Sequence, residues 1–364
     1  MILLNPGPVN LSAGVRAALG GPDLCHREPE YGALQQRVRT GLLSVYDLDG
    51  ARFAAVLLAG SGTAAVEAML TSLVPSSARI LVLENGAYGE RMTAIARAHR
   101  IPLLRICAPW DGALDAAEVD AVLERAPDVT HVAVVHHETT TGRLNDLTEL
   151  AAVCRARGAA LLVDAVSSFG AESLPLEEGA IAACAATSNK CLHGAPGVSF
   201  VVADRAALER GPIPPRGVYL DLRNHCRMQD ERSTAFTPAI PALYALDVAL
   251  AEHRAAGGWS ARHQRYRELA ERIARELAKL GVDPFVAAAE ASVVLRSYRL
   301  PRGGSYARLH DALRARGFVI YAGQGHLAGS IFRISTMGEL ADADLDRLID
   351  AFRELARAKG GAST

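Results

Sequence analysis

A lysine and an aspartate stand at the ends of two apolar runs, where buried strands would deliver them to a shared crevice. Lys190 follows the run Ala182–Thr187, and Asp164 closes the run Ala160–Asp164. A lysine in a largely buried pocket loses proton affinity, so its amine can combine with an aldehyde and carry protons. The alternative is a strand-end lysine that reaches water.

Asp164 is the one carboxylate in the otherwise apolar stretch Ala-Ala-Leu-Leu-Val-Asp. A carboxylate against the ring nitrogen of a pyridoxal cofactor keeps that nitrogen protonated, which lets the ring withdraw electrons. The alternatives are a helix N-cap and a metal ligand, but no cluster of His and Asp at ligand spacing accompanies this residue. The pair therefore favours chemistry on an aldehyde cofactor.

The turn Gly60-Ser61-Gly62-Thr63 joins an apolar run to a predicted helix that begins near Ala64. Backbone N–H groups and two hydroxyls meet there at a helix N-terminus, which suits a phosphate. Ser and Thr also cap ordinary helices, and no Gly-Lys-Ser/Thr follows as in a nucleotide-binding P-loop. The turn indicates a phosphate site only in combination with the lysine and the aspartate.

Seven short apolar runs between about residues 50 and 205 alternate with longer amphipathic stretches, which is typical of strands that alternate with helices. The runs are 53–58, 79–83, 102–106, 131–136, 160–164, 182–187 and 198–203. They predict an α/β fold whose sheet is mostly parallel and covered on both faces. In such a sheet the polar residues after the strand ends converge on one crevice.

The strand rhythm stops after about residue 205. We expect a loop over 211–216 and a long helix over 238–255. The segments that follow are predicted as helices near 262–280 and 306–316, strands near 292–296, 319–321 and 331–334, and a final helix from about 342. This mixture predicts a separate, small α+β domain.

The composition is that of an ordinary globular protein. The 39 Lys and Arg nearly cancel the 40 Asp and Glu, so no global field recruits nucleic acid or an anionic membrane. The six cysteines form no Cys-x-x-Cys pair, and the start of the chain lacks a signal segment. We therefore expect a cytoplasmic protein with reduced thiols and with no nucleic-acid or membrane partner.

The ordered set of motifs is more specific than any single one. From Leu-Asn-Pro-Gly-Pro at the start, the set runs through Gly-Ser-Gly-Thr, Asn-Gly-Ala-Tyr-Gly-Glu-Arg, His-His-Glu-Thr-Thr-Thr-Gly, Asp-Ala-Val-Ser-Ser-Phe-Gly and Ser-Asn-Lys-Cys-Leu-His-Gly to Phe-Arg-Ile-Ser-Thr. It resembles the class V aminotransferases of pyridoxal-phosphate fold type I. The resemblance implies a large domain at 21–255 with a seven-stranded sheet, a small domain at 256–364, and an arm at 1–20 that contributes to the active site and the small domain.

The resemblance also implies roles for individual residues. Lys190 would bind pyridoxal 5′-phosphate as a Schiff base, Asp164 would face its ring nitrogen, and Tyr88 would stack on its ring. The cofactor phosphate would be bound by Ser61, Gly62 and Thr63, by Thr187 or Asn189, and by Thr237 from the other subunit of a homodimer. Thr139 or Thr140 would reach the ring hydroxyl. Arg333, which on its own could be a surface salt-bridge residue, would anchor the acidic group of the substrate.

Within this family the sequence most resembles enzymes that move an amino group between 2-aminoethylphosphonate and pyruvate. Two positions depart from that pattern. His137 replaces a cysteine, and its role is either packing or catalysis. The segment with His26 and Arg27 resembles alanine:glyoxylate and serine:pyruvate transaminases, so this second activity stays open, and the two residues either recognise the substrate or pair with Glu28 and Glu30.

Two other classes of function are weaker alternatives. A lyase or desulfurase on the same fold needs a reactive cysteine on a mobile loop. Cys191, beside the lysine, is better interpreted as a small buried filler. A regulatory module that only binds the cofactor would not need the lysine, the aspartate, the phosphate turn and the arginine together.

Overall fold

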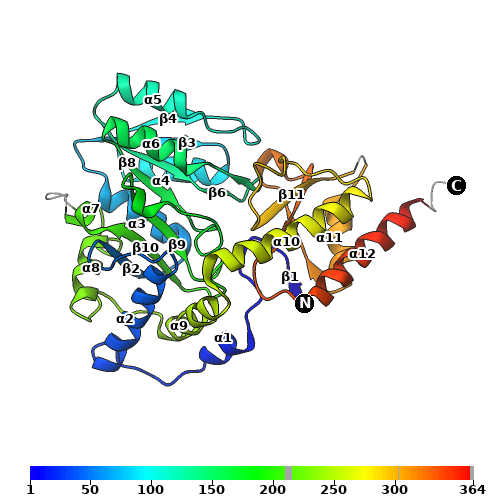
Figure 1. Cartoon of the computed structure of the whole chain (residues 1–364), viewed down its shortest axis with the longest axis horizontal. Coiled ribbons are helices and arrows are strands. Elements are labelled where there is room, and N and C mark those ends of the chain that lie inside the picture. The colour runs from blue at the N-terminus through cyan, green and yellow to red at the C-terminus, as the bar shows by residue number, and fades with distance from the viewer. Residues whose placement is uncertain (210–214, 302, 361–364) are drawn as a thin grey trace.

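The computed structural model describes residues 1–209, 215–301 and 303–360. Figure 1 shows a large lobe built around a twisted sheet and a smaller lobe beside it, with helix α10 (Gly258–Ala278) leading from one to the other. Most of the loop expected over 211–216 lies outside the described residues.

The large lobe contains a seven-stranded sheet, as the sequence predicted. Its strands are β2 (Phe53–Ala59), β3 (Arg79–Glu84), β4 (Leu103–Cys107), β5 (Val129–Val135), β8 (Ala160–Asp164), β9 (Ile181–Thr187) and β10 (Val198–Asp204). They lie in the order β2-β10-β9-β8-β5-β3-β4. Strand β10 runs antiparallel to both of its neighbours, whereas the other neighbouring pairs are parallel. The prediction of an α/β fold with a mostly parallel sheet is confirmed.

Helices cover both faces of this sheet, because each strand is apolar on both sides. In β2, Ala55 and Leu57 pack against one layer of helices, and Ala54, Val56 and Leu58 pack against the other. The first layer comprises α2 (Pro29–Ser44), α5 (Ala116–Arg125), α6 (Leu147–Arg157) and α9 (Ile240–Ala255). The second comprises α3 (Gly62–Leu73), α4 (Ala87–Ala98), α7 (Arg205–Glu209) and α8 (Leu222–Asp230).

The small lobe contains a three-stranded antiparallel sheet in the order β11-β14-β13. Its elements are β11 (Leu295–Arg299), α11 (Tyr306–Arg314), β12 (Phe318–Val319), β13 (Tyr321–Ala322), β14 (Ile331–Ser335) and α12 (Asp342–Gly360). The N-terminal strand β1 (Ile2–Leu3) pairs with β12 in a separate two-stranded sheet.

Two strand predictions in this lobe were wrong in their bounds. The strand predicted near 292–296 begins at Leu295, because Ser292 and Val293 instead donate hydrogen bonds to the carboxylate of Glu172 in the large lobe. The single strand predicted near 319–321 is divided between β12 and β13, which belong to different sheets. Both errors arise from partners that lie far away in the sequence.

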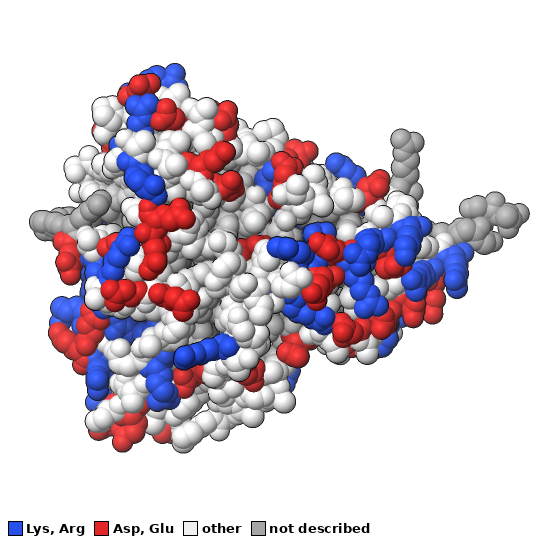
Figure 2. Space-filling model, in the orientation of Figure 1, with Lys and Arg blue, Asp and Glu red and all other residues white. Residues whose placement is uncertain are grey.

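Charges of both signs are interspersed on the surface. Figure 2 shows this on one face, and on the small lobe the mixture is dense along α10 and α12. Ion pairs join these helices, among them Arg265 with Asp342 at 2.9 Å and Arg353 with Glu276 at 2.7 Å. Among the described residues, no helix is both long enough and apolar enough to cross a bilayer.

Candidate active site

The turns that follow several strand ends meet at one edge of the large sheet. Asp164 ends β8, and Lys190 lies three residues beyond the end of β9, its neighbour in the sheet. The turn after β2 contacts the turn after β8, since a Cβ at Gly62 would lie 2.7 Å from both methyl carbons of Val166. The predicted lysine, aspartate and phosphate turn therefore share one crevice.

Lys190 is held under the N-terminal arm. Its amine donates a hydrogen bond to the carbonyl oxygen of Pro6, and a Cβ at Gly7, whose φ is +114°, would lie 2.7 Å from Nζ. Residue 7 must therefore be glycine for the arm to cover the lysine in this way. Burial lowers the pKa of the Lys190 amine to about 8, although the negative charge of Asp164 acts in the opposite direction.

Asp164 is a buried carboxylate, with 6% of the residue exposed. Its Oδ1 accepts a hydrogen bond from the Val166 amide at 2.9 Å, and Oδ2 accepts none from the described residues. Burial raises the pKa of its carboxyl to about 6, against the opposing effects of the Val166 hydrogen bond and of the charges on Arg91 and Lys190. A buried carboxylate with one free oxygen suits a cationic N–H partner, which a protonated pyridine nitrogen would supply.

The predicted phosphate site lies at the N-terminus of α3. Ser61 is the N-cap residue, but its hydroxyl makes no capping hydrogen bond and stays exposed. The first N–H groups of a helix have no partner within the helix, and the helix dipole attracts an anion to them. The hydroxyl of Thr63 accepts a hydrogen bond from Arg91 at 3.2 Å. The turn thus offers amides and two hydroxyls to a phosphate.

Thr187 and Asn189 contact each other next to Lys190. The Thr187 hydroxyl donates to Oδ1 of Asn189 at 2.8 Å and lies 3.1 Å from the carbonyl oxygen of Val198. Because the one proton of the hydroxyl is used in these contacts, the Asn189 amide group is the freer donor of the two.

Tyr88 is positioned by Glu138, for which no role was predicted. Tyr88 is the second residue of α4, and Glu138 accepts hydrogen bonds from the amides of Tyr88 and Gly89 at 3.1 and 3.3 Å. Glu138 is completely buried, and burial raises the pKa of its carboxyl. Glu138 lies on the short strand β6 (His137–Glu138) and caps the N-terminus of α4 as an N-cap side chain would. Its only signal in the sequence is a carboxylate at the end of a buried strand.

The two threonines proposed for the ring hydroxyl are not equivalent. The Thr140 hydroxyl donates to Glu138 at 2.5 Å and accepts from the Ala87 amide at 3.2 Å. The Thr139 side chain makes no hydrogen bond to the described residues, although only 1% of the residue is exposed. The structure therefore leaves Thr139 as the hydroxyl that is free to bind a ligand.

Arg333 is buried in the interior and is not a surface residue. It lies on β14 with 1% of its surface exposed, and burial lowers the pKa of its guanidinium. Its Nε donates to the Ala322 carbonyl and its Nη1 to the Thr139 carbonyl, both at 2.8 Å, and Nη1 also contacts Gln324 at 3.2 Å. Its Nη2 is buried with no partner among the described residues. A buried cation whose Nη2 amino group is unused is a candidate anchor for an anionic substrate.

His137 and Cys191 are buried near the lysine. The Nδ1 of His137 lies 3.1 Å from the Ser167 carbonyl, and its Nε2 has no partner among the described residues. Burial lowers the pKa of His137 to about 4, so the ring is neutral at pH 7. Burial raises the pKa of the Cys191 thiol to about 12, which removes it as a thiolate nucleophile and agrees with a filler role.

Three predicted site residues do not contact Lys190 of their own chain. Among the described residues, no hydrogen bond or ion pair joins this lysine to Thr237, His26 or Arg27. Thr237 is exposed on the loop before α9, where it lines a small cavity with Ala59 at the end of β2. Arg27 donates to the carbonyl oxygen of Thr234 on this loop at 3.1 Å, and it forms no ion pair with Glu28 or Glu30.

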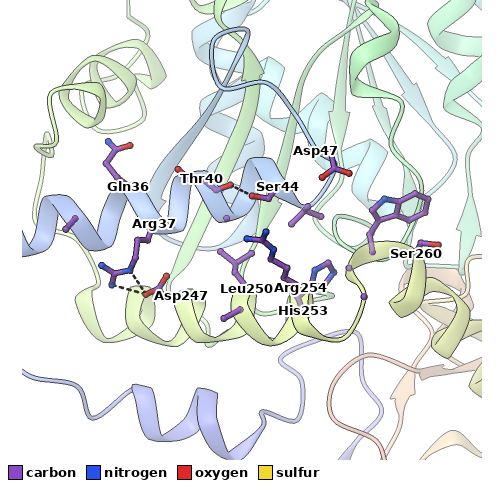
Figure 3. Close-up of a pocket in the computed structure, with 17 residues that line it drawn as sticks. Gln36, Arg37, Thr40, Ser44, Asp47, Asp247, Leu250, His253, Arg254 and Ser260 are labelled. Atoms are coloured by element: carbon purple, nitrogen blue, oxygen red, sulfur yellow. Dashed lines mark hydrogen bonds and ion pairs between the residues drawn. The ribbon is translucent and has the colours of Figure 1, made fainter.

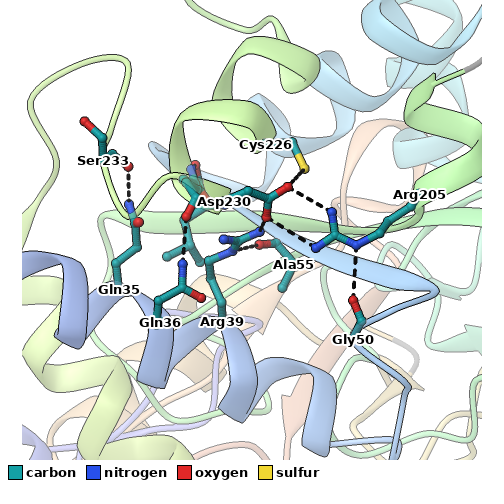
Figure 4. Close-up of polar contacts among 11 residues, drawn as sticks. Gln35, Gln36, Arg39, Gly50, Ala55, Arg205, Cys226, Asp230 and Ser233 are labelled. Carbon is teal, nitrogen blue, oxygen red and sulfur yellow. Dashed lines mark hydrogen bonds and ion pairs between the residues drawn. The ribbon is translucent and has the colours of Figure 1, made fainter.

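The loop with Thr237 is fixed by side chains from α2 and α8, as Figure 4 shows in part. Gln35 donates to the Ser233 carbonyl at 3.0 Å, and Asp230 pairs with Arg39 at 2.6 Å. The amide of Gln229 both donates to and accepts from the backbone of Leu57, so it occupies the edge of β2 as a neighbouring strand would. Thr237 is thereby held near Ala59 at the end of β2, the residue that the phosphate turn follows.

A groove of about 760 Å³ lies between α2 and α9 (Figure 3). Thr40, Ser44, Asp47 and Arg254 lie along it, and an ion pair between Arg37 and Asp247 closes one end. None of the predicted site residues lines this groove. The groove is therefore separate from the crevice that contains Lys190 and Asp164.

Comparison with known proteins agrees with the geometry. The family model for class V aminotransferases matches residues 35–344. A 2-aminoethylphosphonate–pyruvate transaminase of Burkholderia thailandensis is 39% identical over 363 residues, which cover 99% of this chain and 97% of the relative. One from Lysinibacillus sphaericus is 34% identical over 350 residues, covering 96% and 95%. The crystal structure of an alanine–glyoxylate aminotransferase from Nostoc sp. matches with a TM-score of 0.90 at 27% identity, covering 97% of this chain and 94% of that one.

The chain belongs to the class V aminotransferase family. It is a pyridoxal-phosphate-dependent enzyme that moves an amino group between an amino donor and a 2-oxo acid, as the sequence predicted. The residues present fit this cofactor: a lysine with a lowered pKa, a buried carboxylate with a free oxygen, and a helix N-terminus whose Ser61 hydroxyl makes no capping hydrogen bond lie together.

Proposed function

We propose that this enzyme transfers the amino group of 2-aminoethylphosphonate to pyruvate, reversibly, and forms phosphonoacetaldehyde and alanine. The observation that carries the proposal is Arg333, a buried guanidinium whose Nη2 has no partner among the described residues. Both substrates carry an anionic group for this cation, a phosphonate in one and a carboxylate in the other. The names of the relatives at 34% and 39% identity support the choice of donor.

Each cofactor-binding residue has a separate task. Pyridoxal phosphate, when bound, supplies an aldehyde for the substrate amine and a ring that withdraws electrons from the neighbouring carbon. Asp164 holds a proton on the ring nitrogen, and Tyr88 covers the ring. The phosphate is held by Ser61, Gly62 and Thr63 with help from Asn189 rather than Thr187, whose hydroxyl is already used.

Lys190 is the base in this proposal. With a pKa lowered to about 8, a sizeable fraction of its amine is neutral near that pH, so Nζ can take a proton from the substrate carbon and return it. Thr139 binds the ring hydroxyl, because the Thr140 hydroxyl is engaged by Glu138. The Pro6–Gly7 segment lies over the lysine and limits the access of water to it.

We propose a homodimer whose interface includes the edge of β2. Val218 and Tyr219 are exposed there at 80% and 43%, beside the loop with Thr237. A two-fold partner that covers this patch would bring its own Thr237 to the phosphate turn that follows Ala59. Arg27, on the same surface, would also approach the partner's site.

The predicted division of the chain is part of this proposal. Residues 21–255 form the cofactor-binding domain and 256–364 the small domain. The arm at 1–20 serves both, since β1 pairs with β12 while Pro6 contacts Lys190. The six free cysteines support a reducing compartment, and we place the enzyme in the cytoplasm.

Rapid mixing with single amino donors tests the substrate. The cofactor-loaded enzyme is mixed with 2-aminoethylphosphonate, alanine or serine while the visible absorption of the bound cofactor is followed. We expect a rapid loss of absorption with 2-aminoethylphosphonate, and with alanine through the reverse reaction. Rapid loss with alanine and serine but none with 2-aminoethylphosphonate would reject the proposed donor.

The second candidate is an alanine:glyoxylate or serine:pyruvate transaminase. The segment with His26 and Arg27 and the similarity to the Nostoc structure favour it. In this alternative Arg333 binds only carboxylates. Glyoxylate accepted in preference to pyruvate, together with a fast reaction of serine, would support it.

A further inference from the structure

Arg91 is a cation beside the predicted phosphate turn, and no role was predicted for it. It lies on α4, three residues after Tyr88, so the two side chains share one face of the helix. Its guanidinium carbon lies 4.5 Å from the centroid of the Tyr88 ring, within the range of a cation–π contact. The guanidinium is thus fixed beside the residue proposed to stack on the cofactor.

The second contact of Arg91 is with the phosphate turn. Its Nη1 donates to the Thr63 hydroxyl oxygen at 3.2 Å. A hydroxyl that accepts from a guanidinium keeps its own proton for another acceptor. The Thr63 O–H group is therefore free to donate toward an anion at the N-terminus of α3.

The charge of Arg91 is not neutralised within the described part of the chain. No carboxylate lies within ion-pair distance of its guanidinium, and the adjacent Glu90 instead accepts from the Trp110 indole at 3.1 Å. The Arg91 charge acts on both Asp164 and Lys190 as a lesser influence after burial. A phosphate dianion bound by amides and hydroxyls alone would lack a cationic partner, and Arg91 lies beside those groups.

We propose that Arg91 is the cation of the cofactor's phosphate site, with Thr63 and Tyr88 holding its guanidinium next to the N-terminus of α3. This inference rests on the proposed phosphate site and on no choice of amino donor. In the alternative, Arg91 only stacks on Tyr88 as a surface cation.

Comparing two ligands that differ only in the phosphate tests the inference. The full-length chain is freed of cofactor, and the dissociation constants of pyridoxal phosphate and of pyridoxal are measured from visible absorption for the wild type, Arg91→Met and Arg91→Lys. We expect Arg91→Met to weaken pyridoxal phosphate about 10- to 100-fold and pyridoxal by less than about threefold, because only the first ligand has the charge-assisted contact. Arg91→Lys should recover part of the loss.

The matched control is Arg97→Met, which removes an exposed arginine from the same helix. It should change neither constant, and melting temperatures should show that each variant is folded. Equal weakening of both ligands in Arg91→Met would assign Arg91 to ring stacking and overturn the proposal. So would unchanged constants with a raised KM for 2-aminoethylphosphonate, which would make Arg91 a substrate residue. If all variants bound pyridoxal phosphate poorly, wild type included, the proposed phosphate site itself would fail.

Discussion

The Arg333 guanidinium donates a hydrogen bond from Nη1 to the carbonyl oxygen of Thr139 across 2.8 Å, which joins strand β14 of the small lobe to the turn after the short strand β6 (His137–Glu138). One end of the guanidinium is thereby fixed by the protein, and Nη2 remains for the substrate. The same contact places the proposed anchor next to the threonine proposed to bind the ring hydroxyl.

Arg333→Lys should lower kcat/KM for both substrates by at least about 30-fold, since loss of a buried charged hydrogen-bond partner costs roughly 2 kcal/mol or more. A lysine retains the charge but cannot reach the Ala322 carbonyl, the Thr139 carbonyl and the substrate together. Steady-state kinetics measure the effect. The control is Arg299→Lys on the adjacent strand, which changes an exposed arginine. Equal losses in both variants would contradict the role of Arg333.

Asp164→Asn should slow turnover at least about 100-fold, because the amide cannot hold the ring nitrogen protonated. In the cofactor-free protein it should instead stabilise the fold. The folded pKa of about 6 lies above the ordinary value of 3.8, so the unprotonated carboxylate costs stability as the pH rises through 6.

Urea unfolding at two pH values measures this second effect. At pH 8 the cofactor-free variant should be more stable than the wild type by roughly 2 to 3 kcal/mol. Near pH 4, where the carboxyl of the folded protein is protonated, most of the difference should vanish. A stability difference that is the same at both pH values would show that the carboxylate is not strained by burial.

Glu138→Gln should disturb the cofactor ring through Tyr88, without direct contact between residue 138 and a substrate. The two oxygens of Glu138 accept four hydrogen bonds, two on each oxygen. Glutamine keeps only one acceptor oxygen, and its NH2 group cannot accept the other two. We expect a loss of stability of about 1 to 3 kcal/mol and a changed circular dichroism of the bound cofactor. Glu90→Gln, on the same helix, is the control. A loss of stability with an unchanged cofactor spectrum would leave Glu138 a purely structural residue.

Subunit mixing tests the proposed exchange of Thr237. Lys190→Ala should abolish activity, and Thr237→Val should weaken pyridoxal phosphate about 10-fold, a loss of ~1.4 kcal/mol. In a mixed dimer one site combines Lys190 of the Thr237→Val chain with Thr237 of the Lys190→Ala chain. When the two variants are unfolded and refolded together, this site should recover the wild-type affinity for pyridoxal phosphate, which is measured as activity at limiting cofactor. No recovery, despite mixed dimers, would mean that Thr237 serves its own chain or none.

The sequence was sufficient for the fold because the evidence for it was local. The strands of the large sheet are mostly apolar runs followed by polar residues. The ends of the six strands other than β10 lie at the same edge, because these six run in one direction. The positions of Lys190 and Asp164 relative to one another follow from this pattern alone.

Contacts between segments that are far apart in the sequence could not be predicted from local patterns. Glu138 accepts a hydrogen bond from the Tyr88 amide in α4, which lies 50 residues earlier in the sequence. Arg333 donates one to the carbonyl oxygen of Thr139, which lies 194 residues earlier. The choice between Thr139 and Thr140 depends on the partners of one hydroxyl, and the burial of Arg333 depends on the packing of two lobes. Nothing in the periodicity of either segment encodes these facts.

The covalent attachment of the cofactor at Lys190 is the central claim, and borohydride reduction followed by peptide mass analysis tests it most directly. The chain contains only two other lysines, Lys279 and Lys359. We predict that the pyridoxyl-phosphate mass is found on the peptide with Lys190 and on neither of the others, and that Lys190→Ala carries no label and turns over no substrate. A label on Lys279 or Lys359, or full turnover by Lys190→Ala, would contradict the account.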